Sequence, residues 1–185
     1  MLITKWGKAL DKNHPLCEYP RPQFVRDSYI SLNGMWKCAF YNKPDCEDEK
    51  FRYDICVPFS PEAYLSGVHR TLEPGEYLIY KRNFVIPKGF NKGRVFINFG
   101  AVDQIATVFI NGNNVATHKG GYTSFKFEIT DYVTDGENEI MPVGRVSTRS
   151  SAVSMPLAAS ALRRTGPKPL ISASVRMMFL SWGAR

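Results

Sequence analysis

The chain has 185 residues, with 24 Lys and Arg against 17 Asp and Glu, which gives a formal net charge of +7. This length accommodates one ordinary domain with an extension, and it excludes a complete (β/α)₈ barrel beside anything else, because such a barrel needs about 200 residues. Phe, Tyr and Trp make up 13% of the chain, which indicates a packed core and not a disordered polymer.

The positive charge is confined to the end of the chain. Residues 141–185 contain seven Lys and Arg and no Asp or Glu, so residues 1–140 hold 17 residues of each sign. A uniformly basic domain would suggest a nucleic-acid or membrane partner, whereas a body without net charge gives no such indication. The net charge therefore describes the tail alone.

The N-terminus has no apolar stretch of the kind that a signal peptide needs, and no uncharged apolar run approaches the length of a membrane span. We therefore expect a cytoplasmic protein without a membrane partner. The four cysteines, Cys17, Cys38, Cys46 and Cys56, are then expected to be reduced thiols, because disulfides belong to exported proteins.

Apolar residues alternate with polar ones from about residue 30, which predicts β-strands. The first strand covers 36–40, after Asn33-Gly34, and the second ends at Pro58. Between them, the acidic stretch 44–50 is interpreted as a solvated loop and not as a metal site. A long strand is predicted over 77–86, where Pro87 ends it.

The same alternation predicts strands over 95–99, 107–110, 114–118 and 125–129. Asn111-Gly112 is the signature of a tight hairpin, because both turn positions tolerate positive φ. A further strand opens at 137–140 and is expected to stop at Met141-Pro142, because proline has no N–H for a ladder. The pattern as a whole predicts an all-β sandwich that is incomplete at its C-terminal strand, followed by an irregular or disordered tail.

Three origins of the tail are open. Its Ser-, Ala- and Arg-rich composition is that of an organelle transit peptide, which belongs at the other end of a chain. It could be a disordered arm that binds phosphates. A foreign extension, such as a frame shift produces, fits best, because the alternation of the body stops abruptly at 141.

Four segments, 20–40, 57–87, 93–133 and 136–140, resemble in order the N-terminal sugar-binding domain of glycoside hydrolase family 2. The family includes β-galactosidases and β-glucuronidases. The most specific stretch runs from Asn98-Phe99-Gly100-Ala101-Val102-Asp103 through Asn111-Gly112 to Gly120-Gly121-Tyr122. The resemblance implies a jelly-roll sandwich, with an N-terminal extension over 1–19, the sugar-binding domain over 20–143 and a tail over 144–185 that is not native to the family.

In this family the acid/base and the nucleophile are two glutamates on a downstream barrel, and the sugar-binding domain packs on that barrel and on an immunoglobulin-like domain. The resemblance therefore implies no catalytic residue, metal or cofactor in this chain, so Glu62, Glu73 and Glu76 are not assigned that role. His69 and His118 have no Ser, Cys or second His at a spacing that suits a triad or a metal site.

Three residues are weak candidates for contact with carbohydrate. Ser60 and Glu62 follow Val57-Pro58 in the loop that, in the family, approaches the mouth of the active site. Tyr122 lies between glycine and threonine in a predicted loop, where an aromatic ring is more often exposed than on a strand.

The sequence is thus identified as the non-catalytic part of a β-galactosidase-like glycosidase, which would hydrolyse O-glycosyl bonds of a β-galactoside or β-glucuronide only as a full-length enzyme. One alternative is a stand-alone carbohydrate-binding module. A nucleic-acid binder that uses its basic tail is the less favoured alternative.

Overall fold

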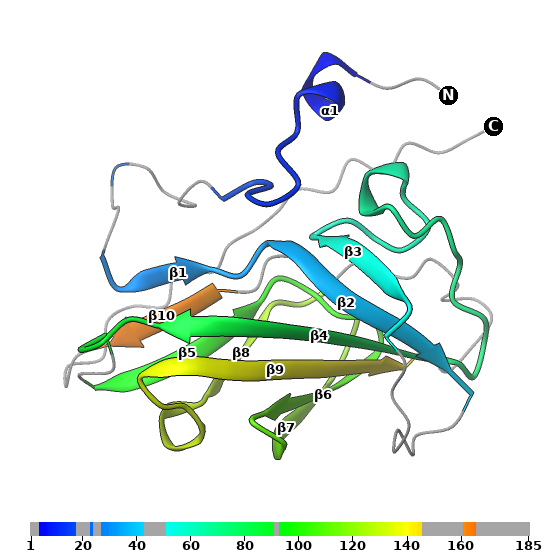
Figure 1. The fold of residues 1–185 in the computed structure, drawn as a ribbon. Helices are drawn as coiled ribbons and strands as arrows, with labels where there is room; N and C mark the ends of the chain where they lie inside the picture. Colours follow the sequence, from blue (N-terminus) through cyan, green and yellow to red (C-terminus); the bar gives the residue numbers. More distant parts are fainter. Residues whose placement is uncertain are drawn as a thin grey trace.

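A computed structural model describes residues 4–17, 23, 27–42, 51–90 and 93–145, together with the backbone of 161–165. The strands form two antiparallel sheets that face each other as a sandwich, and this confirms the predicted all-β fold (Figure 1). One sheet has six strands in the order β3-β2-β4-β9-β6-β7, and the other has four in the order β1-β10-β5-β8.

The elements have the following bounds: α1 Lys5–Lys8, β1 Tyr29–Ser31, β2 Gly34–Tyr41, β3 Tyr53–Val57, η2 Tyr64–Ser66, β4 Tyr77–Ile86, β5 Arg94–Phe99, β6 Ile105–Ile110, β7 Asn113–Lys119, β8 Phe125–Glu128, η3 Thr130–Tyr132, β9 Gly136–Arg145 and β10 Ala161–Thr165.

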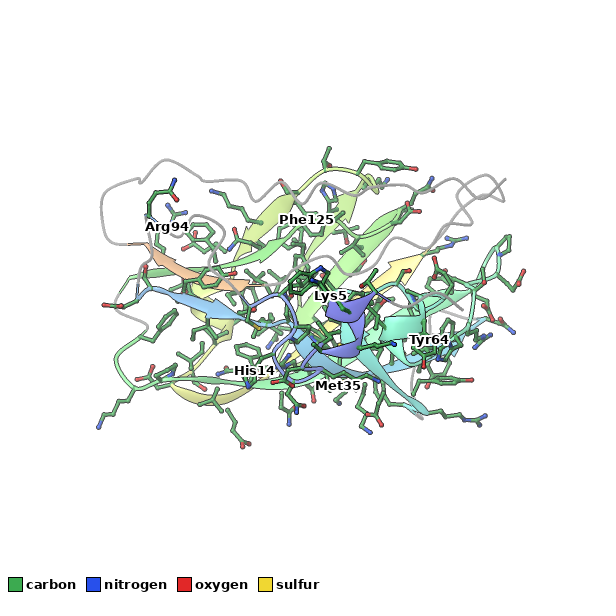
Figure 2. The ribbon with its side chains drawn as sticks, turned by 90° about the horizontal axis from the view of Figure 1, so that it is seen from above. Lys5, His14, Met35, Tyr64, Arg94 and Phe125 are labelled. Carbon is green, nitrogen blue, oxygen red and sulfur yellow. The ribbon has the colours of Figure 1, made fainter. Side chains whose placement is uncertain are left out.

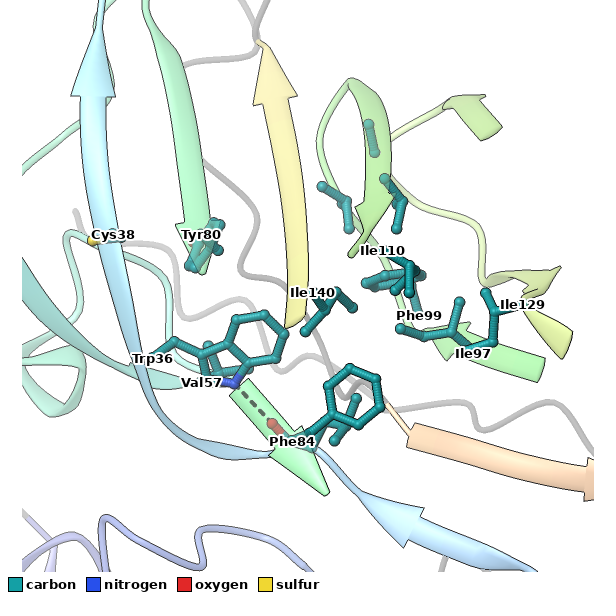
Figure 3. Close-up of a cluster of buried hydrophobic side chains, with 14 of the residues drawn as sticks. Trp36, Cys38, Val57, Tyr80, Phe84, Ile97, Phe99, Ile110, Ile129 and Ile140 are labelled. Atoms are coloured by element: carbon teal, nitrogen blue, oxygen red, sulfur yellow. Dashed lines mark hydrogen bonds between the residues drawn. The ribbon is translucent and has the colours of Figure 1, made fainter. Parts of the chain in front are cut away.

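The core lies between the two sheets, because alternate residues of facing strands point inward. Trp36 of β2 packs edge-on against Tyr80 of β4, with ring centroids 6.4 Å apart. Ile97 of β5 and Ile140 of β9 are fully buried in the same cluster (Figure 3). The predicted alternation is therefore the pattern that brings the two sheets together.

The Asn111-Gly112 turn joins β6 to β7 as predicted. Both residues have positive φ, 49° and 79°, which is the backbone that a tight hairpin between right-twisted strands requires. β7 ends the six-stranded sheet, and most of its side chains are polar and exposed, among them Asn113, Asn114 and Lys119.

The prediction that the strand after Asp135-Gly136 stops at Met141-Pro142 is wrong. β9 continues to Arg145 and lies between β4 and β6, with Pro142 paired to Val108 of β6. On its other side, β9 pairs with β4 before and after Met141-Pro142 but not at these two residues. Successive residues of a strand direct their N–H groups to opposite neighbours, so the missing N–H interrupts only one of the two ladders.

The prediction of an incomplete sandwich and an irregular tail also needs a correction. β10, from within the tail, pairs antiparallel with β1 on one side and with β5 on the other. Five residues of the tail therefore complete the four-stranded sheet. The rest of the tail, 146–160 and 166–185, lies outside the described residues.

Residues 4–17, which we name the N-terminal strap, lie over the start of β2 (Figures 1 and 2). The side-chain amide of Asn33, in the corner between β1 and β2, donates hydrogen bonds to the carbonyls of Pro15 and Leu16 at 3.2 and 3.1 Å. The Cys56 thiol donates to the Lys12 carbonyl at 3.6 Å. The strap is thus held mainly through its backbone carbonyls.

Gly34 allows the strap to approach this closely. Its φ is +129°, and a Cβ built on it would lie 2.6 Å from the carbonyl oxygen of Asn13. Gly34→Ala is therefore expected to lower the free energy of unfolding by about 1–3 kcal/mol, because it adds a steric overlap to an unfavourable backbone conformation. Urea denaturation of both proteins measures this loss.

Gly75→Ala is the matched control, since Gly75 also has positive φ, +90°, but a Cβ built on it would have no neighbouring atom within 4 Å. The control should lose only the backbone contribution, about 1 kcal/mol. An equal decrease in the free energy of unfolding for the two variants would show that the strap does not restrict the space at Gly34.

Candidate functional site

The loop between β3 and β4, residues 58–76, carries two of the predicted contact residues. The backbone N–H of Ala63 donates to the Ser60 carbonyl at 2.9 Å, and that of Arg70 donates to the Pro61 carbonyl at 3.2 Å. The buried Ser66 hydroxyl lies 2.7 Å from the Ala63 carbonyl and accepts from the Val68 N–H at 3.1 Å. The loop is therefore internally braced, and it holds Ser60 and Glu62 half-buried at its beginning.

An ion pair fixes the end of the same loop. Arg70 donates to the Glu76 carboxylate at 2.6 Å, and the other oxygen of Glu76 accepts from the Glu73 N–H at 2.9 Å. The Arg70 guanidinium also lies 4.0 Å from the centre of the Phe40 ring. Glu76 is only 9% exposed, so its carboxylate has a structural role.

A groove of about 360 Å³ separates this loop from the N-terminal strap. Lys8 and Lys12 line it on the strap side, and Tyr64 and His69 line it on the loop side. The Tyr64 side chain is 46% exposed, and its ring meets the His69 ring edge-on at 5.3 Å. An aromatic surface beside nitrogen donors is suited to a polar ligand such as a sugar.

Tyr122 lies in another loop, between β7 and β8, and its side chain is 82% exposed. Gly121 has no room for a side chain, because a Cβ there would overlap the Asp103 carboxylate. Asp103 is 7% exposed, and its Oδ1 has no hydrogen-bond partner. A buried carboxylate thus lies directly under the loop that presents Tyr122.

The structure brings Ser60 and Glu62 together in one loop but does not join Tyr122 to them. Their loop leaves β3, at one edge of the six-stranded sheet, whereas the Tyr122 loop leaves β7 at the opposite edge. Sequence reasoning did not select Tyr64. The signal that selected Tyr122, an aromatic residue in a loop close to glycine, also applies to Tyr64.

His118, Cys38 and Cys56 serve packing. The His118 ring stacks on Phe125, with centroids 4.0 Å apart and planes inclined by 17°. Burial raises the pKa of the Cys38 thiol to about 12 and also raises the pKa of Cys56, so neither thiol is activated as a nucleophile. Cys17, Cys38 and Cys56 are free, and Cys46 lies outside the described residues.

Within the described ranges, no group of three or more His, Cys, Asp or Glu side chains is arranged to hold a metal ion. The acidic stretch 44–50 lies outside those ranges, so the interpretation of it as a solvated loop remains a prediction. No helix among the described residues is long and apolar enough to span a membrane.

Comparison with known proteins shows which family part of this chain is similar to. Residues 69–153 match the family model "Glycosyl hydrolases family 2, sugar binding domain". A β-galactosidase of Thermoanaerobacter pseudethanolicus is 37% identical over 127 residues, which are 65% of this chain and 17% of that protein. A β-glucuronidase of Bacteroides fragilis is 38% identical over 109 residues, which are 58% of this chain and 15% of that protein.

The fold is shared with solved structures at lower identity. The Lactobacillus rhamnosus β-glucuronidase aligns with a TM-score of 0.63 at 22% identity, over 75% of this chain and 29% of the other. At this identity the likeness concerns the fold alone. The chain spans less than a fifth of the length of the two curated relatives above.

The buried Asp103 carboxylate makes stability depend on pH. Burial raises the pKa of Asp103, so the folded state binds the proton more tightly than the unfolded chain does. The contribution of Asp103 to the free energy of unfolding is then fully present below the ordinary carboxyl pKa of about 3.9. It is lost as the pH rises through the raised pKa of the folded state. Asp103→Asn removes the charge and is expected to increase the free energy of unfolding at neutral pH, as measured by urea denaturation at about pH 4 and pH 7.

Asp131→Asn is the control, because Asp131 is exposed in η3. It should leave the difference in stability between the two pH values unchanged. A loss of stability at neutral pH in Asp103→Asn would mean that the carboxylate is stabilised where it lies, contrary to this account.

Proposed function

We propose that the chain carries the sugar-binding domain of glycosyl hydrolase family 2 and is the non-catalytic part of a β-galactosidase- or β-glucuronidase-type enzyme. The observation that carries the proposal is the family match over residues 69–153, which spans β4 to β9 of the sandwich. The whole enzyme would hydrolyse the O-glycosyl bond of a β-galactoside or β-glucuronide. Its two catalytic carboxylates, about 5 Å apart in a retaining mechanism, would belong to a separate barrel domain.

The surroundings of Glu128 support the assignment of catalysis to another domain. A general acid in glycoside hydrolysis needs a raised pKa. Hydrogen bonds from Arg94 and Thr130 instead lower the pKa of Glu128. The lowered pKa favours the ionised form of Glu128, and an ionised carboxylate cannot protonate a leaving group.

In the whole enzyme, the sugar-binding domain would cover 20–143, with the extension 1–19 before it and the tail 144–185 after it. The tail would still contribute the last residues of β9 and the strand β10 to the sandwich. It would pack on an immunoglobulin-like domain and on the barrel. The braced loop after β3 would then present the Ser60 hydroxyl and the Glu62 carboxylate to sugar hydroxyls. Tyr122, at the opposite edge of the sheet, would contact either sugar or a neighbouring domain through its exposed ring.

The first test concerns the chain by itself. Incubation with 4-nitrophenyl β-galactoside and 4-nitrophenyl β-glucuronide is expected to release no nitrophenol above the buffer background, because the two paired carboxylates would be supplied by another domain. Release above background that persists after repurification would contradict the proposal.

The second test transfers the domain into a relative. Residues 4–165, which include β10, replace the matching segment of the Thermoanaerobacter pseudethanolicus β-galactosidase, and the chimera is expected to hydrolyse an aryl β-galactoside. In the chimera, Ser60→Ala and Glu62→Gln should each raise KM by roughly threefold to tenfold, which corresponds to one lost hydrogen bond to substrate. Steady-state kinetics separate KM from kcat.

Lys126→Met serves as the control in the chimera, because Lys126 lies exposed on β8 of the other sheet. It should leave KM unchanged. An active chimera in which the loop variants also keep the parental KM would retain the domain assignment and exclude the loop after β3 from the substrate site.

A further inference from the structure

The groove between the N-terminal strap and the loop after β3 carries charge of one sign. Its volume of about 360 Å³ is at the lower end of the range for small-molecule sites. Lys8 and Lys12 line the strap side and His69 lines the loop side, and none of the described residues that line the groove is acidic. A concave surface with positive charge alone favours an anionic occupant.

The two lysines are not neutralised by carboxylates of the described part of the chain. None of the ion pairs found there involves Lys8 or Lys12. Asp11, the only acidic residue of the strap, accepts a hydrogen bond from the Asn13 N–H at 2.9 Å and does not line the groove. Both ammonium groups therefore keep their capacity to bind an anion.

The backbone of the strap fixes the position of both lysines. The Cys56 thiol of β3 donates to the Lys12 carbonyl at 3.6 Å. Lys8 ends the helix α1, where its N–H donates to the Thr4 carbonyl at 3.1 Å, and the Thr4 hydroxyl accepts from the Gly7 N–H at 3.1 Å. Because this backbone is held before a ligand arrives, binding orders only the side chains and costs less entropy.

The loop side supplies an aromatic ring and a third nitrogen group. Figure 2 shows Tyr64 beside α1 of the strap, and the Tyr64 ring meets the His69 ring edge-on at 5.3 Å. The φ of His69 is +57°, and residues other than glycine in such unfavourable conformations cluster at ligand sites. The Arg70 N–H donates to the Pro61 carbonyl at 3.2 Å, so the braced loop holds His69 in this conformation.

We propose that this groove binds a phosphate monoester whose organic part is a ring. The phosphate would accept hydrogen bonds from the Lys8 and Lys12 ammonium groups, and its charge of about −2 would match theirs. The ring would pack against Tyr64. A carboxylate is a poorer match, because it has one charge and two oxygens, whereas a phosphate has a third oxygen for His69.

The test separates the contributions of the phosphate and the ring. The ¹⁵N-labelled full chain is titrated at about 0.15 M NaCl with phenyl phosphate, with phenol and with inorganic phosphate. Phenyl phosphate is expected to shift the amide signals of Gly7 and Gly67, one on each side of the groove, with a Kd on the order of 1 mM. Phenol and inorganic phosphate should each bind roughly tenfold more weakly.

The variants distinguish a binding role from a folding defect. Lys8→Met and Lys12→Met should each weaken the binding of both phosphates roughly tenfold. Tyr64→Ala should weaken the binding of phenyl phosphate and leave that of inorganic phosphate unchanged, which a misfolded protein would not do. Lys5→Met is the matched control, because the Lys5 ammonium lies on the same helix, 4.6 Å from the centre of the Trp6 ring, and does not line the groove.

The proposal is wrong if phenol binds as tightly as phenyl phosphate, or if Lys5→Met weakens binding as much as Lys12→Met does. It is also wrong if methyl β-galactoside displaces phenyl phosphate at equal concentration, because the groove would then be a site for neutral sugars. Ser60 and Glu62 do not line this groove. Failure here would therefore leave the chimera experiment unaffected, and failure of the chimera would leave this site intact.

Discussion

The corner between β1 and β2, where the chain passes from the four-stranded sheet to the six-stranded sheet, is the point on which the rest of the structure depends. The Leu32 carbonyl accepts hydrogen bonds from the Trp36 indole and from the Arg82 guanidinium, each at 2.8 Å, and Arg82 also donates to the Asn33 carbonyl at 2.9 Å. Burial lowers the pKa of Arg82, so these carbonyls compensate an otherwise costly cation. The corner joins the two sheets and, through Asn33, also holds the strap.

The same corner sets the register of β2 and therefore determines which of its side chains point inward and which point outward. Side chains alternate along a strand, so a slip by one residue would exchange the inward and outward sets. With Trp36 fixed inside by its hydrogen bond, Met35 and Lys37 must face outward. The hydrophobic core and the exposed ion pair of Lys37 with Asp54 are thus two results of one register.

The sequence predicts the fold well where one face of a strand is buried, because burial imposes a period of two. The strand over 77–86 and the Asn111-Gly112 hairpin follow from this. The prediction from sequence fails at Pro142. The rule that proline lacks an N–H donor does not say whether the hydrogen bond is lost towards β4 or towards β6, and the strand continues because only one side is affected. The strap could not be foreseen for a different reason: it docks through the carbonyls of Pro15 and Leu16, and a backbone carbonyl has no signature in sequence. The groove lined by Tyr64 forms only where the strap docks, so the sequence could not predict it either.

The edge strand β7 has a consequence for association. An exposed strand edge is a template for pairing with another chain, and charged or polar side chains on it oppose such pairing. Asn113, Asn114, Thr117 and Lys119 are exposed along β7, so two copies brought together at this edge would have to desolvate amides and set one lysine against another. Self-assembly into extended sheets is therefore disfavoured on this side of the sandwich.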